Sequence, residues 1–161
     1  VAFWPDSFWL VPPPGPTDII GIAQWGEGLD TLWCLRANGK VFWCGDNPGG
    51  GGLPPAEIDR HRIVDIVASY RLLSLARSDQ GRLFVWGYAN NEGQLDVPAD
   101  AQSDVVEIRV GWDGTIAAVR KKDGRWIAWG SDKYGVVTKI NQLSAEVPEI
   151  AFCENRLLWI E

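Results

Sequence analysis

The chain has 161 residues, which is enough for one ordinary domain with a sizeable hydrophobic core. Its 15 basic and 21 acidic side chains give a formal net charge of −6, so it lacks the basic footprint of a nucleic-acid-binding protein. Hydrophobic residues make up 46% of the chain, which excludes wholesale disorder, and no apolar run reaches the ~18 residues of a transmembrane helix.

Residues 1–11 contain Asp6 and four aromatic side chains but no basic segment, so we expect no signal peptide. The three cysteines show no C-x-x-C spacing, which argues against a disulfide framework and a zinc site. The single histidine, His61, offers no choice of partners for a Ser-His-Asp set. We therefore expect no metal, no cofactor and no catalytic residue. The expected compartment is reducing, either cytoplasmic or associated with a virion.

Three segments of the chain align with one another, at residues 19–47, 63–91 and 105–133. Isoleucines mark the start of each unit, at intervals of 44, 42 and 42 residues: Ile22, Ile66, Ile108 and Ile150. Glycines mark a turn inside each unit, at intervals of 42 and 43 residues: Gly39, Gly81 and Gly124. A period of about 42 residues with short strands inside each unit is typical of a β-propeller.

Each unit predicts three short strands within these segments. In the first unit, Asn38-Gly39 favours a two-residue hairpin turn, which would pair Cys34 with Trp43 and put Cys34 and Cys44 on opposite faces. In the second unit, Asp79-Gln80-Gly81 predicts a turn that is one residue longer. The strands predicted for the second and third units are 63–68, 72–77, 82–86, 105–110, 115–120 and 125–129.

The two ends of the chain resemble parts of a unit. Residues 1–8 match the end of a unit and residues 147–153 match the start, so the two ends together make a fourth unit. We expect one all-β domain over 1–161, a β-propeller of about four four-stranded blades with one blade split between the termini. The predicted boundaries are 1–17 (end of the split blade), 18–60, 61–102 and 103–146 (blades), and 147–161 (start of the split blade).

The second unit carries the most specific motif. Trp86-Gly87 is followed by the residues N-N-E-G-Q-L at 90–95, and this pattern resembles the repeats of the regulator-of-chromosome-condensation superfamily of β-propellers. Residues 97–103 are similar to the inter-blade segment of the bacterial β-lactamase inhibitor proteins of that superfamily. The first unit departs from the pattern, with Cys44 in place of the tryptophan and four glycines at 49–52. Propellers of this superfamily usually have seven blades, whereas this chain supplies about four.

Two arrangements would complete the split blade, because an unpaired sheet edge invites pairing. The chain could close on itself as a four-bladed ring, or chains could pair head to tail, and we favour the homo-oligomer. The residues predicted to take part in this assembly are Phe3, Trp4, Ile150, Phe152 and Trp159.

Large aromatic residues recur at the loop after the first strand of each unit: Trp25, Tyr70 and Trp112. At one end of a propeller they would form an aromatic rim, with Glu27 and Asp113 beside them, that suits a basic protein partner. The alternative is that the aromatic residues cap the channel and the acidic residues are ordinary surface. Trp4, Trp86 and Trp129 share another repeat position and are expected to pack between blades.

The sequence therefore predicts a non-enzymatic protein–protein interaction module that assembles head to tail and binds neither nucleic acid nor membrane. One alternative is a structural subunit of a virion or another large assembly. A second is a glycan-acting enzyme with a carboxylate pair, although no spacing selects such a pair.

Overall fold

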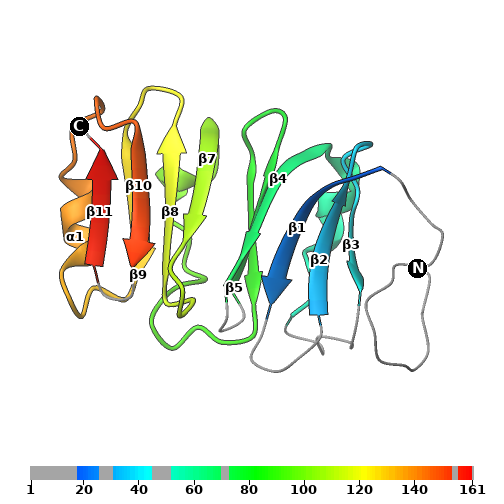
Figure 1. Cartoon of the computed structure of the whole chain (residues 1–161), viewed down its shortest axis with the longest axis horizontal. Helices are drawn as coiled ribbons and strands as arrows, with labels where there is room; N and C mark the ends of the chain where they lie inside the picture. Colours follow the sequence, from blue (N-terminus) through cyan, green and yellow to red (C-terminus); the bar gives the residue numbers. More distant parts are fainter. Residues whose placement is uncertain (1–17, 26–30, 45–51, 70–72, 154–155, 161) are drawn as a thin grey trace.

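The computed structural model describes residues 18–25, 31–44, 52–69, 73–153 and 156–160 of the chain. These ranges form antiparallel sheets that stand in a row in chain order (Figure 1). The strands are β1 (Ile19–Trp25), β2 (Thr31–Arg36) and β3 (Val41–Cys44) in the first sheet; β4 (Ile63–Ala68), β5 (Leu73–Ser78) and β6 (Leu83–Gly87) in the second; β7 (Val105–Val110), β8 (Ile116–Lys121) and β9 (Trp126–Gly130) in the third; and β10 (Glu149–Cys153) and β11 (Arg156–Ile160) in the fourth. The connections carry the 3-10 helices η1 (Ala56–Arg60) and η2 (Ala99–Ala101) and the short helix α1 (Val136–Asn141). The predicted all-β architecture is confirmed.

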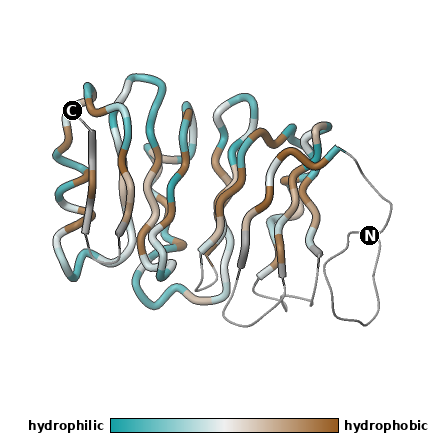
Figure 2. The backbone as a smooth tube through the Cα atoms, viewed as in Figure 1, coloured by the Kyte–Doolittle hydropathy of each residue, from teal (hydrophilic) through white to brown (hydrophobic). Residues whose placement is uncertain are grey.

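A hydrophobic cluster lies between each pair of neighbouring sheets, so the core is divided into layers along the row. In the first cluster, for example, Trp33 and Leu35 of the first sheet pack with Ile66 and Phe84 of the second. Hydrophobic stretches follow the strands and hydrophilic ones gather at many of the turns (Figure 2). Each inner sheet is therefore apolar on both faces, as a stack of blades requires.

The recurring tryptophans occupy these layers. Trp86 and Trp129 are buried in the first and second clusters, which confirms the prediction that this repeat position packs between blades. Trp86 meets Trp33 edge to face, with ring centroids 5.5 Å apart. Trp4, the third member of the predicted set, lies outside the described residues.

The sheets have three strands where complete, so the prediction of four-stranded blades was wrong for the part of the chain that the structure describes. Connections take the place of the fourth strand. At β9, the Asn141 side chain of α1 accepts a hydrogen bond from the Ala128 N–H (2.8 Å) and donates one to the Ala128 carbonyl (3.0 Å). At β6, the Leu83 N–H donates to the carbonyl of Gln102. These contacts satisfy edge groups that a further strand would otherwise pair.

The register of the first hairpin also differs from the prediction. Trp33 pairs with Trp43 and Cys34 with Phe42, one residue away from the expected pairing. The reason is the turn: the Arg36 N–H donates to the Lys40 carbonyl, and Gly39 adopts a φ of +82°. This is a three-residue loop closed by a left-handed glycine.

The same three-residue loop closes the other two hairpins, at Gly81 and Gly124, so the second turn is not longer than the first. In the corrected register Cys44 pairs with Leu32, two positions from Cys34. The predicted pairing, which put Cys34 and Cys44 on opposite faces of the hairpin, was therefore wrong.

Candidate functional site

The loop after β7 holds the most exposed tryptophan of the described residues. Strands β7 and β9 both run antiparallel to β8, so they finish at the same end of the third sheet. The loop at 111–115 and the connection at 131–135 therefore lie along the same edge of the row, the lower edge in Figure 1. We call this edge the loop edge.

Trp112 stands on a rigid turn at the loop edge. Its side chain is 63% exposed. The Gly111 N–H donates to the Ile116 carbonyl (2.8 Å), and the Gly114 N–H donates to the Gly111 carbonyl (3.0 Å). Asp113 Oδ1 accepts from the backbone N–H of Thr115 (3.1 Å) and from its hydroxyl (2.9 Å). A predicted rim residue, Asp113, thus also fixes the turn that presents the indole ring.

Two exposed tyrosines that the sequence analysis did not select also lie at the loop edge. Tyr88 follows β6 and Tyr134 follows β9, and both side chains are largely exposed. The ammonium group of Lys133 lies 5.4 Å from the centroid of the Tyr134 ring, within cation–π range. The sequence held a signal for them, because both tyrosines follow the Trp-Gly pair that ends the third strand of the second and third units. They were missed because they do not recur at one repeat position.

The other predicted partner-binding residues are described only in part. The backbone of Trp25 ends β1, at the same end of its sheet, because β1, β4 and β7 each run antiparallel to the middle strand. Glu27 and Tyr70 lie outside the described residues. The clustering of Trp25, Tyr70 and Trp112 remains a prediction.

The predicted assembly residues divide in the same way. Phe3 and Trp4 lie outside the described residues, and only the backbone of Trp159 is described, paired with Ile150. Ile150 is buried and Phe152 is half-buried, and both pack on the third sheet of their own chain. Their side chains contribute to a layer inside the chain.

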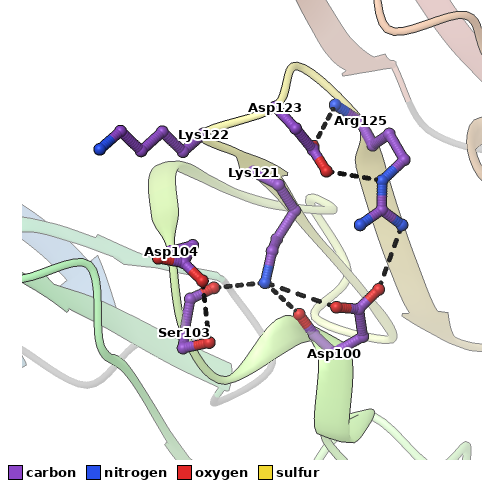
Figure 3. Close-up of a pocket in the computed structure, with 7 residues that line it drawn as sticks. All are labelled: Asp100, Ser103, Asp104, Lys121, Lys122, Asp123 and Arg125. Atoms are coloured by element: carbon purple, nitrogen blue, oxygen red, sulfur yellow. Dashed lines mark hydrogen bonds and ion pairs between the residues drawn. The ribbon is translucent and has the colours of Figure 1, made fainter.

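A polar cavity of about 380 Å³ opens at the β8–β9 turn, on the side of the third sheet opposite the loop edge (Figure 3). Its lining residues are Asp100, Ser103, Asp104, Lys121, Lys122, Asp123 and Arg125. Buried Lys121 donates to the carbonyls of Asp100 and Ser103 and lies 3.7 Å from the Asp100 carboxylate. Lys122 extends away from the other six residues (Figure 3). The cavity holds no histidine among its lining residues.

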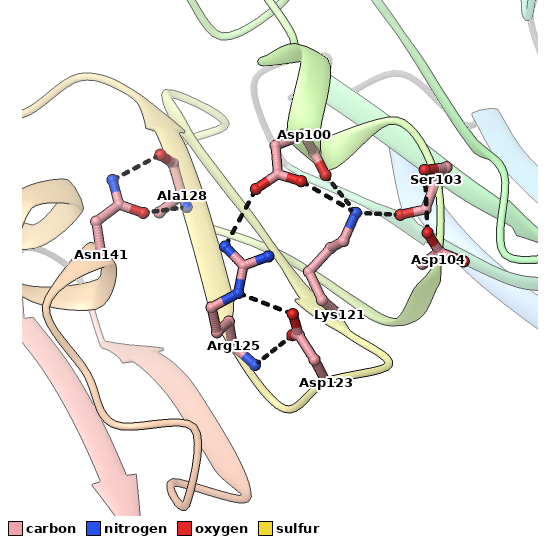
Figure 4. A network of polar contacts seen from close by, with 8 residues as sticks. All are labelled: Asp100, Ser103, Asp104, Lys121, Asp123, Arg125, Ala128 and Asn141. Carbon is pink, nitrogen blue, oxygen red and sulfur yellow. Dashed lines mark hydrogen bonds and ion pairs between the residues drawn. The ribbon is translucent and has the colours of Figure 1, made fainter.

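Ion pairs connect the walls of this cavity (Figure 4). Arg125 donates from Nε to the Asp123 carboxylate (2.8 Å) and from Nη1 to the Asp100 carboxylate (3.1 Å). The hydrogen bond from Arg125 holds the pKa of the exposed Asp123 carboxyl below its ordinary value. These contacts hold helix η2 against the β8–β9 turn. The residues that line the cavity therefore stabilise the connection between the second and third sheets.

A second charged cluster joins the third sheet to the fourth. Glu107 accepts from Arg120 at 2.9 and 2.8 Å and pairs with Arg109, which lies 3.8 Å from Glu149 of the fourth sheet. Burial raises the pKa of Asp65, the register partner of Arg77, and attraction to Arg77 offsets part of that increase. Such a shift was not predicted from the sequence, because it depends on burial by the neighbouring sheets.

Among the described residues, no cluster of three His, Cys, Asp or Glu side chains could hold a metal ion. No helix in the described ranges is long and apolar enough to cross a membrane.

Comparison with known proteins indicates which class of protein the chain resembles. No model of a known protein family matches the chain. A human relative, probable E3 ubiquitin-protein ligase HERC6, is 30% identical over a stretch covering 63% of this chain and 12% of the relative. The chain thus spans a small part of that relative's length.

Two solved structures share the fold. Human WBSCR16 has a TM-score of 0.54 and 23% identity, covering 70% of this chain and 33% of that chain. Prp20p from Saccharomyces cerevisiae, described with its binding to Gsp1p and histones, has a TM-score of 0.53 and 18% identity. It covers 80% of this chain and 33% of that chain.

The repeated sheets and these likenesses define a propeller-type protein. The human relative and Prp20p support the regulator-of-chromosome-condensation type of propeller, as the motif at Trp86-Gly87 implied. The narrower likeness to the bacterial β-lactamase inhibitors stays a prediction.

Proposed function

We propose that this chain is a non-enzymatic protein-interaction module that binds a protein partner through the loop edge. The observation that carries the proposal is the 63% exposed Trp112, presented on a hydrogen-bonded turn at the same end as Tyr88 and Tyr134. An exposed aromatic side chain on a rigid turn buries a large area on binding at little cost in conformational entropy.

The charge of the loop edge favours a partner with a basic surface. The described residues of its loops include four acidic side chains and one basic side chain. The acidic ones are Glu92, Asp96, Asp113 and Asp132, and the basic one is Lys133. The neighbour Prp20p is described with its binding to histones, which are basic. Core histones are therefore a suitable first probe of the partner class.

The test is a titration of labelled core histones with the wild type and with Trp112→Ala. We expect the variant to bind at least about tenfold more weakly, which corresponds to about 1.4 kcal/mol, and we expect wild-type binding to weaken with added salt. The double variant with Trp25→Ala and Trp112→Ala tests whether Trp25, a second aromatic residue of the predicted rim, also contributes to binding.

Val106→Ala is the matched control, because Val106 is an exposed apolar residue at the opposite end of β7. Equal binding by Trp112→Ala and the wild type would contradict the loop edge as the site. No histone binding by the wild type would contradict this class of partner.

We also propose that the chain forms about four blades. Three are bounded at 18–60, 61–102 and 103–146, and one is split between 1–17 and 147–161. Each proposed unit from 18 to 146 contains one three-stranded sheet, and β10 and β11 form a two-stranded sheet, which supports a split fourth blade. Chains would then join head to tail, and deletion of residues 1–9 would disrupt the oligomer. The cytoplasmic or virion-associated compartment stays a prediction, and a structural subunit of a virion or another large assembly is the second candidate function.

A further inference from the structure

The two ends of the row expose side chains at repeat positions that are buried everywhere else. On the first strand of each sheet, the recurring isoleucine is at most 7% exposed in the last three sheets: Ile66, Ile108 and Ile150. In the first sheet the equivalent Ile22 is 62% exposed. Ile22 faces away from the second sheet, because its neighbour Ala23 belongs to the first cluster.

The last sheet shows the mirror situation. The residue that follows each isoleucine pairs with a residue on the second strand, and in the first three sheets that partner is 0% exposed: Trp33, Leu75 and Ala118. In the fourth sheet the partner is Leu158, paired with Ala151, and it is 58% exposed.

These two positions contribute to the same cluster at every internal layer. Trp33 shares a cluster with Ile66, Leu75 with Ile108, and Ala118 with Ile150. One end of the row therefore exposes the second-strand half of this pair, at Leu158, and the other end exposes the first-strand half, at Ile22. The two faces lie at opposite ends of the row, so the chain as it stands does not bring them together (Figure 1).

We propose that the Leu158 face of one copy packs on the Ile22 face of a second copy, and so repeats the internal layer between chains. A second copy is the occupant favoured here because it offers the missing half of a contact that the chain already makes three times. Such a contact is heterologous, so it generates a ring if the rotation closes and a filament if it does not. The inference deepens the proposed head-to-tail assembly and rests on it, but it needs neither the loop edge nor strand exchange by residues 1–9.

The experiment compares solution masses of the full 161-residue chain by light scattering or native mass spectrometry. We expect the wild type at twice 17.8 kDa or a higher multiple, and both Ile22→Arg and Leu158→Arg at 17.8 kDa. Both positions are exposed, so the variants should retain the wild-type circular dichroism and thermal transition.

Mixing the two variants gives the decisive result. The Ile22→Arg copy keeps a wild-type Leu158 face and the Leu158→Arg copy keeps a wild-type Ile22 face. We therefore expect one-to-one pairs of two chains and nothing larger. Ile20→Arg is the matched control: Ile20 is 61% exposed, and its equivalent Val106 stays 39% exposed inside the row, so the control should assemble like the wild type.

Several outcomes would overturn the inference. A monomeric wild type would show that nothing from a second copy covers Ile22. Wild-type assembly by both arginine variants, or no pairs in the mixture, would exclude this contact. If deletion of residues 1–9 dissociates the oligomer while both arginine variants still assemble, the split blade holds the chains together and the face-to-face contact is wrong.

Discussion

At the scale of single residues, two tryptophans at one repeat position differ in a single hydrogen bond. Trp129 Nε1 donates to the Gln94 carbonyl at 2.9 Å, whereas the buried Trp86 Nε1 has no partner among the described residues. The first unit has glycines where the second has the Gly-Gln-Leu motif, so the residue equivalent to Gln94 differs in sequence there. Comparing the two tryptophans therefore isolates the contribution of the indole hydrogen bond from that of packing.

We expect Trp129→Phe to destabilise the protein more than Trp86→Phe, by about 1 kcal/mol in the free energy of unfolding. Both variants lose similar indole volume, but only Trp129→Phe leaves the Gln94 carbonyl without its donor. Urea denaturation of the two variants measures the difference. Equal destabilisation would mean that the hydrogen bond contributes nothing net.

Asp65 links stability to pH. Because burial raises its pKa in the folded state above the ordinary value of 3.8, the folded chain binds this proton more tightly than the unfolded chain does. The stabilisation from protonated Asp65 is complete below pH 3.8 and is lost as pH rises through the folded-state pKa. Ionised Asp65 therefore opposes folding at neutral pH.

We expect Asp65→Asn to gain stability relative to the wild type as pH rises from about 3 to 7, because the amide cannot ionise. Asp123→Asn is the control of opposite sign: the hydrogen bond from Arg125 lowers the pKa of Asp123, so its stabilisation is present above pH 3.8 and lost as pH falls. Denaturant titrations across this range measure both. Parallel pH profiles for Asp65→Asn and the wild type would contradict the assignment.

At the scale of elements, the three-residue turns decide how each hairpin closes. Gly39, Gly81 and Gly124 all have φ near +80 to +90°, a backbone region that other residues rarely adopt. At Gly124 an added Cβ would also lie 2.6 Å from the Ala145 carbonyl oxygen. The turn is thus packed against the connection that leads to the fourth sheet.

We expect Gly124→Ala to destabilise the protein by more than the ~1 kcal/mol typical of a strained left-handed residue, because the backbone of Ala145 must also move. Gly135→Ala is the matched control: Gly135 has a φ of +68°, but no atom lies within 4 Å of its added Cβ. Thermal unfolding of the two variants gives the comparison. Equal destabilisation by the two variants would show that the backbone at Ala145 moves aside without a cost in stability.

At the scale of the whole molecule, the fold is a short row of interchangeable layers. Each internal layer uses the same two repeat positions, so the row can in principle be extended at either end by another sheet of the same kind. Trp33 and Ile66 show how well one layer buries these positions, and Ile22 and Leu158 show what the ends leave exposed. The solution masses of the wild type, Ile22→Arg and Leu158→Arg therefore test whether a second copy extends the row.

Much of this architecture was readable from the sequence, because it depends on neighbours along the chain. The enrichment of branched residues in Ile63–Ala68 and Val105–Val110 predicted β4 and β7 with the bounds that the structure has. The 42-residue period predicted the repeated sheets, and the recurring Trp-Gly pair predicted the buried tryptophans Trp86 and Trp129.

The tertiary structure decided what depends on contacts between distant segments. The register at Cys34 depends on where the hairpin closes, and a left-handed Gly39 serves a three-residue loop as well as a two-residue turn. The raised pKa of Asp65 depends on burial by neighbouring sheets. Whether a recurring residue is buried or displayed depends on whether a further sheet covers it, so Ile22 and Ile66 carry the same sequence signal and have opposite environments.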